Sequence, residues 1–501
     1  MNTSSAGSQA DSIKPAPGWF SGQPRGLSTL FYVEMWERFS YYGMRALLVL
    51  FMVTPADEGG LGFATAEAAT LYGSYTMAVY MLSIPGGFIA DRIMGARRAV
   101  LLGAILIALG HYCLAVPHVS TFYAGLILVA LGTGLFKPSI SALVGGLYAR
   151  DDQRRDAGFS LFYMGINIGA FMAPLVTGFL AQSASFKAWL AGNGFAPEMS
   201  WHWGFAAAGA GMTLALALLA RRIPQLPPDE VLAAVSAETW RKAAAVIAGT
   251  ALLMALALAS DAEGWQGLRW MFIVLPLAAI AWFSRSAGLD ARRMAAVGVF
   301  FIASMVFWAL FEQAGVSIAL FADQLTRNEV AGLAFPSAWF QSLNALFVIV
   351  LSPLFALAWT QLGDRQPSSP MKFALGLLFL SLSFLLMVPA AQLTIAGKVS
   401  PLWLAGLFFL QTVGELFLSP VGLSVMTRLA PSGFTGLLLG VWFLASAFGN
   451  KLAGVIGSSF DAKDPLALSA FFLHQGLFVM AASVVLICLV PWMKRLMGGV
   501  R

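Results

Sequence analysis

Charged residues, cysteines and histidines are all scarce in this chain. Only 11% of its 501 residues are charged and 59% are hydrophobic, whereas a soluble domain carries about 25% charged residues. The two cysteines and four histidines show no metal-ligand spacing, and the sequence contains no Walker loop. These absences argue against a soluble enzyme, a metal or other cofactor, and ATP as the energy source. The composition predicts a membrane protein.

Apolar stretches long enough to cross a bilayer recur along the whole chain. Lys and Arg lie mainly between these stretches, on one side of the membrane if the chain alternates. The net charge of +6 therefore predicts cytoplasmic loops and cytoplasmic termini rather than a surface for nucleic acid. The stretches predict an all-α polytopic membrane protein with about fourteen helices, near residues 28–53, 66–92, 98–117, 120–149, 157–182, 202–221, 240–259, 267–285, 294–322, 335–362, 371–391, 401–430, 434–457 and 469–494.

The two halves of the chain carry a similar motif at equivalent positions. Residues 86–98, which contain Ala-Asp-Arg, close the second apolar stretch, and residues 363–367, which begin with Gly-Asp-Arg, take the equivalent place in the later half. Such a parallel repeat predicts a two-bundle transporter with its substrate site between the bundles. The stretches at 240–285 break the repeat and predict an inserted hairpin outside this core. The predicted division is a disordered cytoplasmic tail at 1–27, six-helix bundles at 28–222 and 292–495, the hairpin with its linkers at 223–291, and a cytoplasmic tail at 496–501.

A polar stripe runs along the first predicted helix. The residues that recur at helical spacing and share one face are Glu34, Glu37, Arg38, Tyr41, Tyr42 and Arg45. A single charge at the centre of a lipid-spanning helix costs roughly 2.5–3.5 kcal/mol, so we expect this stripe to face a polar cavity. A self-neutralising set of charges is the simpler alternative. That alternative does not account for Arg45 and the two tyrosines on the same stripe.

Three more charged residues lie inside apolar stretches. Lys137 follows a Gly-rich run, Glu312 lies one turn after Trp308, and Glu415 has no cation within one helical turn. A solvated position near a helix end remains open for Lys137, and an interfacial position remains open for Glu312. Inside a bundle, however, the Lys137 ammonium needs a carboxylate partner, and Glu415 is suited to receive an ammonium group.

Several segments resemble motifs of the proton-dependent oligopeptide transporter (POT) family of the major facilitator superfamily, in its bacterial form. Residues 34–43 (Glu-x-x-Glu-Arg-Phe-x-Tyr-Tyr-Gly) resemble the first-helix motif, residues 132–138 the fourth-helix block and residues 159–169 the fifth-helix signature. Ser139 departs from the Asn that the family pattern has after Lys-Pro. A further segment is similar to the signature loop of the superfamily, which implies a conformational role for Gly87, Asp91, Arg92, Gly95, Arg97 and Arg98.

The resemblance implies the major facilitator fold and a proton-coupled symporter that imports di- and tripeptides across the bacterial inner membrane by alternating access. We expect it to be a monomer in membrane lipid, driven by the proton gradient. The resemblance assigns proton coupling to Glu34, Glu37, Arg38, Lys137 and Glu312, with Lys137 paired with Glu37, and Glu312 paired with Arg45 or Lys137. It assigns the amino terminus of the peptide to Glu415, and substrate binding to Arg45, Tyr42, Tyr80, Lys137, Tyr163, Asn167, Trp308, Glu312, Asn344, Glu415, Ser419 and Trp442.

Several alternatives stay open at this point. The neutral residues of this set are equally suited to hydrogen bonds between helices, and Trp442 to ordinary packing. A proton-coupled carrier of drugs keeps the carboxylates but has no need for Arg45, Lys137 and Glu415 to oppose each other. Carriers of nitrate or other anions usually lack the glutamate pair of the first helix, which is intact here. A membrane enzyme or a receptor lacks support, because the sequence shows no nucleophile with a base and no extramembrane domain.

Overall fold

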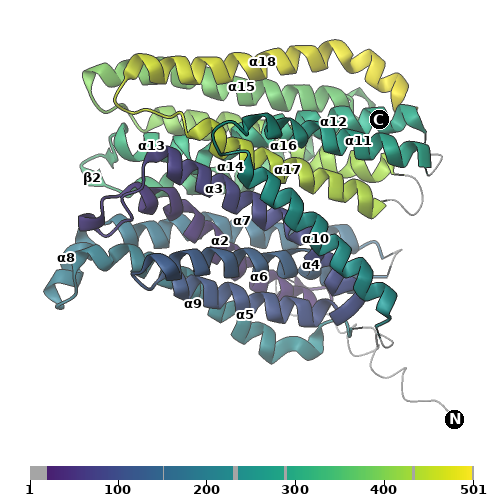
Figure 1. Ribbon diagram of the computed structural model, residues 1–501, viewed down its shortest axis with the longest axis horizontal. Helices are drawn as coiled ribbons and strands as arrows, with labels where there is room; N and C mark the ends of the chain where they lie inside the picture. The colour runs from purple at the N-terminus through teal and green to yellow at the C-terminus, as the bar shows by residue number, and fades with distance from the viewer. Residues whose placement is uncertain (1–19, 150–151, 230–234, 287–289, 431–434, 499–501) are drawn as a thin grey trace. The chain divides into compact units, whose positions relative to one another are not determined.

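The chain folds almost entirely into helices in a computed structural model, which describes residues 20–149, 152–229, 235–286, 290–430 and 435–498 (Figure 1). Among these residues, eleven helices are long and apolar enough to cross a membrane. The remaining expected spans correspond to α2 (Arg25–Val53), to α3 (Thr65–Met81) with α4 (Ser83–Ile89), and to α11 (Met271–Ser286). The predicted all-α polytopic fold is confirmed.

The helices form two compact units, of which the first comprises Met1–Leu61 and Met81–Leu252. In this unit α2 packs along α7 and α9, and α5 packs along α6. Its core includes Leu27 and Leu30 of α2, Ala104 of α5, Phe136 of α6 and Met212 of α9. Besides α2 and α4, its helices are α5 (Ala96–Leu114), α6 (Val119–Gly146), α7 (Arg155–Gln182), α8 (Ala184–Gly192), α9 (Ser200–Arg222) and the larger part of α10 (Ala237–Ala259).

The second unit comprises Gly62–Tyr80 and Leu253–Arg501. Here α15 packs along both α16 and α18, and Figure 1 shows α18, in yellow, alongside α15. A pair of two-residue strands forms an antiparallel hairpin between α13 and α14. With α3 and α11, the elements of this unit are α12 (Ala291–Phe311), α13 (Ser317–Gln324), β1 (Glu329–Val330), β2 (Leu333–Ala334), α14 (Ser342–Leu362), α15 (Ser369–Leu393), α16 (Leu402–Leu429), α17 (Thr435–Gly457) and α18 (Pro465–Leu496).

Two of the predicted spans are interrupted. The span at 66–92 breaks into α3, α4 and a π-helical turn, Ala90–Met94, and the break after Met81 lies where Pro85 removes a helical hydrogen-bond donor. The span at 294–322 breaks into α12, a 3₁₀ turn at Glu312–Gly315, and α13. The second break places Glu312 in the turn itself.

Some predicted boundaries differ from the structure. Residues 20–27, expected in a disordered tail, are ordered: Phe20 is buried and lies edge-to-face against Phe31, and α2 begins at Arg25. The earlier part of that tail lies outside the described residues. Residues 62–80, expected in the first bundle, belong with the second unit. The short helix α8 and the β-hairpin were not predicted, because both are too short to produce an apolar span.

Candidate functional site

A cluster of two carboxylates and one guanidinium is buried on α2. Arg38 Nε lies 2.9 Å from Glu34 Oε1 and 2.6 Å from Glu37 Oε2. The residues Glu34, Glu37 and Arg38 are 3%, 0% and 5% exposed. Glu34 Oε2 and Arg38 Nη2 are enclosed without a hydrogen-bond partner among the described residues. One guanidinium therefore faces two carboxylates, so the cluster has an unbalanced negative charge when both are ionised.

Two glycines of α7 allow α2 to come this close. A Cβ atom added to Gly165 would lie 3.0 Å from the ring of Phe31, and one added to Gly169 would overlap the carbonyl oxygen of Met35 and lie 3.1 Å from Cβ of Arg38. Both glycines belong to the segment that resembles the fifth-helix signature. Their role here is steric, because they let the backbone of α7 contact the turn of α2 that carries the ion pairs.

Lys137, on α6, lies within electrostatic reach of this cluster. Its charge acts on the carboxylates of both Glu34 and Glu37. Helix α6 is held against α4 by a backbone contact at Gly134, where no Cβ atom fits on Gly86. The first unit therefore brings together four of the predicted proton-coupling residues, and this arrangement is consistent with the predicted coupling between Lys137 and Glu37.

The remaining predicted residues of the first unit lie on α2 and α7. The guanidinium carbon of Arg45 lies 5.9 Å from the ring centroid of Tyr42, within the range of a cation–π contact. Asn167 is buried, and its Nδ2 donates a hydrogen bond of 2.9 Å to the carbonyl oxygen of Tyr163, whose own side chain is exposed. The Asn167 amide nitrogen therefore donates within α7 itself.

In the second unit, Glu415 of α16 is held by a residue of α14. Asn344 Nδ2 donates to Glu415 Oε2 at 2.9 Å and to Thr412 Oγ1 at 3.1 Å. Glu312 is 2% exposed, and its charge acts on the Glu415 carboxylate. The structure thus brings together Glu312, Asn344 and Glu415, three residues that were predicted separately for the substrate site. It adds Thr412, for which the only sequence signal was its position three residues before Glu415.

The aromatic residues of the predicted site differ in their surroundings. Trp442 is 3% exposed, covers Gly422 and lies 6.3 Å from the ring of Phe373, which favours a packing role over a pocket wall. Trp308 is partly buried, and its indole Nε1 is enclosed without a hydrogen-bond partner in the described part of the chain. Tyr80 and Ser419 are both partly exposed and both belong to the second unit.

The predicted conformational loop leads into α5. Gly95 has a φ of +87°, and the backbone N–H of Arg97 donates a hydrogen bond of 2.8 Å to Asp229 Oδ1 in the segment after α9. A Cβ atom on Gly95 would overlap the Asp229 side chain. Asp229 was missed, because it is 132 positions away in the chain. Gly87, also predicted in this loop, faces Pro138. The other predicted loop residues, Asp91, Arg92 and Arg98, are exposed.

The long apolar helices, together with buried acidic and basic side chains on them, define a multi-pass membrane carrier. Comparison with protein families leads to a more specific assignment. The family model described as the POT family matches residues 97–467. The chain belongs to the POT family, a family of transporters, and the prediction from its motifs is confirmed.

Similar proteins extend over nearly the whole chain. The peptide transporter YePEPT of Yersinia enterocolitica is 37% identical, with 98% of each chain covered. A di-/tripeptide transporter of Lactococcus lactis is also 37% identical, over 96% of this chain and 98% of its own. Among solved structures, a mutant of a POT peptide transporter in complex with alafosfalin is 40% identical, with a TM-score of 0.86 and 99% of each chain covered.

Proposed function

We propose that this protein is a proton-coupled symporter that imports di- and tripeptides by alternating access. The observation that carries the proposal is the buried cluster of Glu34, Glu37 and Arg38, with Lys137 in electrostatic reach. When one of the two buried carboxylates takes up a proton, the other still pairs with Arg38, and the carboxylate of a peptide can replace the negative charge that Lys137 then loses. Membership of the POT family and the names of the similar transporters support the peptide as substrate.

Peptide recognition is assigned to charged groups in each unit. Asn344 donates an amide hydrogen bond to the Glu415 carboxylate, and the ammonium group of a peptide would add a stronger, charge-assisted donor to the same carboxylate. Arg45 and Lys137 are assigned to the peptide carboxylate. The predicted pairing of Glu312 with one of these two cations stays part of the proposal.

The proton gradient is proposed as the energy source, without a cofactor. One proton moving through roughly 100 mV provides about 2.3 kcal/mol, which corresponds to about fifty-fold accumulation of a neutral zwitterion. The cation-rich loops support cytoplasmic termini, and we place the protein as a monomer in the inner membrane of a bacterium.

Uptake of labelled dialanine into proteoliposomes tests the proposal directly. An inward proton gradient with a negative interior is expected to drive accumulation above equilibrium, and an uncoupler is expected to abolish it. If the folded protein takes up none of a set of di- and tripeptides, the substrate is instead a drug or an anion carried on the same fold.

The role of Glu415 has a sharper test in the ligand. N-acetyldialanine lacks the ammonium group, so the wild-type protein should prefer dialanine by at least about tenfold, since a charge-assisted hydrogen bond contributes about 1.5–3 kcal/mol. The Glu415→Gln variant should lose this preference, whereas the control Glu329→Gln, at an exposed position in β1, should retain it. An unchanged preference in Glu415→Gln would remove the ammonium role from this residue.

A further inference from the structure

A buried lysine of α17 is paired with the turn of the inserted hairpin. Lys451 is 1% exposed, and its Nζ donates a hydrogen bond of 2.7 Å to Ser74 Oγ of α3. The same ammonium forms an ion pair with the carboxylate of Asp261, in the turn that follows α10. All three residues belong to the second unit. These residues were not predicted from the sequence, because neither Lys451 nor Asp261 has a residue of opposite charge within one helical turn along the chain.

The cluster depends on one carboxylate. Ser74 donates its own hydroxyl hydrogen to the carbonyl oxygen of Thr70 at 2.8 Å, so its oxygen is oriented to accept from Lys451. Arg269, at the other end of the hairpin turn, places a second positive charge near the ammonium. Without the Asp261 charge, a buried ammonium would face a serine oxygen and another cation, which is unfavourable away from water.

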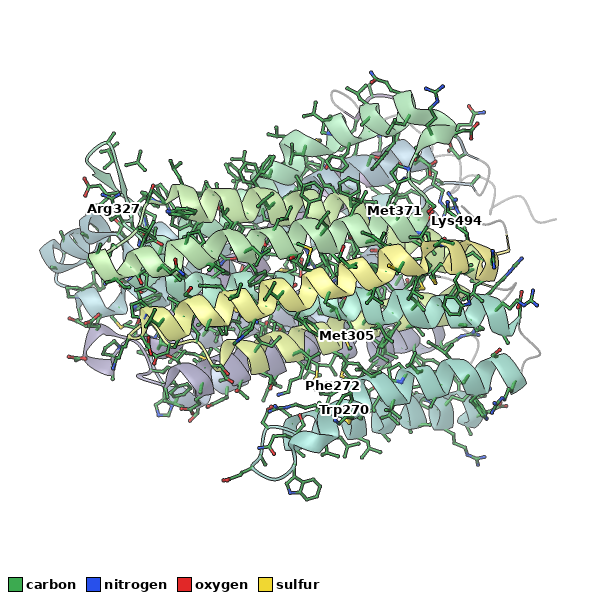
Figure 2. All side chains as sticks on the ribbon, turned by 90° about the horizontal axis from the view of Figure 1, so that it is seen from above. Trp270, Phe272, Met305, Arg327, Met371 and Lys494 are labelled. Atoms are coloured by element: carbon green, nitrogen blue, oxygen red, sulfur yellow. The ribbon has the colours of Figure 1, made fainter. Side chains whose placement is uncertain are left out.

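Lys451 also stands where two helices contact α17. One turn earlier, the ring of Phe448 stacks on Phe272 at the beginning of α11, with centroids 4.7 Å apart (Figure 2 labels Phe272). One turn later, Gly454 meets Gly73 of α3, where an added Cβ atom would lie 2.7 Å from the Gly454 Cα. Residues three apart share a helix face. This face of α17 therefore contacts the hairpin at one end and α3 at the other, and Lys451 is bonded to both.

We propose that Asp261 and Lys451 are positioning residues for transport, through which the inserted hairpin stabilises the packing of α3 on α17. The span 66–92 is divided between the units, with α3 in the second and α4 in the first. Alternating access, on which this inference rests as part of the proposed function, requires the units to move against each other. Because α3 continues directly into α4 of the first unit, this motion loads the contact of α3 with α17. The hydrogen bond between Lys451 and Ser74 opposes a separation of these two helices, and Asp261 sets how readily it breaks.

Labelling of a buried cysteine measures this separation without any peptide. Ala69 of α3 is 0% exposed, and its carbonyl oxygen faces Gly454. We would introduce Ala69→Cys after replacing the two native cysteines by serine, and measure its rate of reaction with a water-soluble maleimide in proteoliposomes. Asp261→Asn is expected to raise this rate roughly tenfold or more, since it removes a charge-assisted contact of a buried ammonium. Glu263→Gln, in the same turn but exposed, is the matched control and should leave the rate unchanged.

Two further variants separate control of the α3–α17 contact from a general loss of stability. The double variant Asp261→Asn with Lys451→Met leaves no uncompensated charge, so it should fold, and it should still label faster because the link to Ser74 is lost. The exchange Asp261→Lys with Lys451→Asp should return the rate toward that of the parent. Labelling that stays at the parent rate in both Asp261→Asn and the folded double variant would overturn the proposal. Faster labelling in a protein that takes up no peptide would refute the proposed substrate alone.

Discussion

Replacement of Arg38 by methionine should destabilise the protein by an amount set by the two carboxylates left behind. Glu34 and Glu37 are 3% and 0% exposed and lose their shared cation. Removing one partner of a buried ion pair costs about 3–5 kcal/mol. We expect the lower end of this range, about 3 kcal/mol, because Lys137 still acts on both carboxylates. At roughly 1 °C per kcal/mol for a chain of this length, the thermal midpoint should fall by about 3 °C.

The assay is the thermal midpoint of the detergent-solubilised protein, followed by loss of the monodisperse peak. Arg25→Met is the matched control, because Arg25 lies on the same helix but is exposed, and it should leave the midpoint nearly unchanged. Adding Glu34→Gln and Glu37→Gln to Arg38→Met should restore most of the stability, since a buried ion-pair cluster replaced by neutral groups of similar size is often close to neutral. The same triple variant should lose proton-driven accumulation of dialanine. If Arg38→Met behaves like Arg25→Met, the cluster is not buried and paired as the structure shows.

Two further predictions concern helix contacts of the first unit. Gly169→Leu should sharply lower the yield of folded protein, because the new side chain meets the carbonyl oxygen of Met35. The control Gly249→Ala, at a position with open space around it, should express like the wild type. Equal yields of the two variants would contradict the close contact of α2 with α7. Asp229→Ala removes the acceptor for the backbone N–H of Arg97 in the first turn of α5 and should cost about 1 kcal/mol, as for loss of an N-cap. Asp229→Asn, which retains an oxygen acceptor, should recover most of the lost thermal midpoint, and a failure to do so would show that the hydrogen bond is not what stabilises this turn.

The sequence determined the membrane class, the helix spans and the polar stripe of α2. A helix that crosses lipid must be apolar over a fixed length, and this requirement can be read along one dimension. The polar stripe could also be predicted from the sequence, because Glu34, Glu37 and Arg38 lie within two turns of one helix and helical spacing alone places them on one face. The motif that contains them also led to the family, which the comparisons confirm.

The tertiary structure decided which distant residues complete these sites. Asp229 supports the start of α5 across 132 positions, and Lys451 meets Ser74 across 377 positions. Thr412 and Asn344 are joined with Glu415 only because α14 packs against α16. The second predicted span is divided between the two units, with α3 in the second and α4 in the first, although its apolar pattern is continuous. Hydropathy and helical spacing report what each helix presents to its surroundings, whereas the partner it meets depends on how helices far apart in the chain pack together.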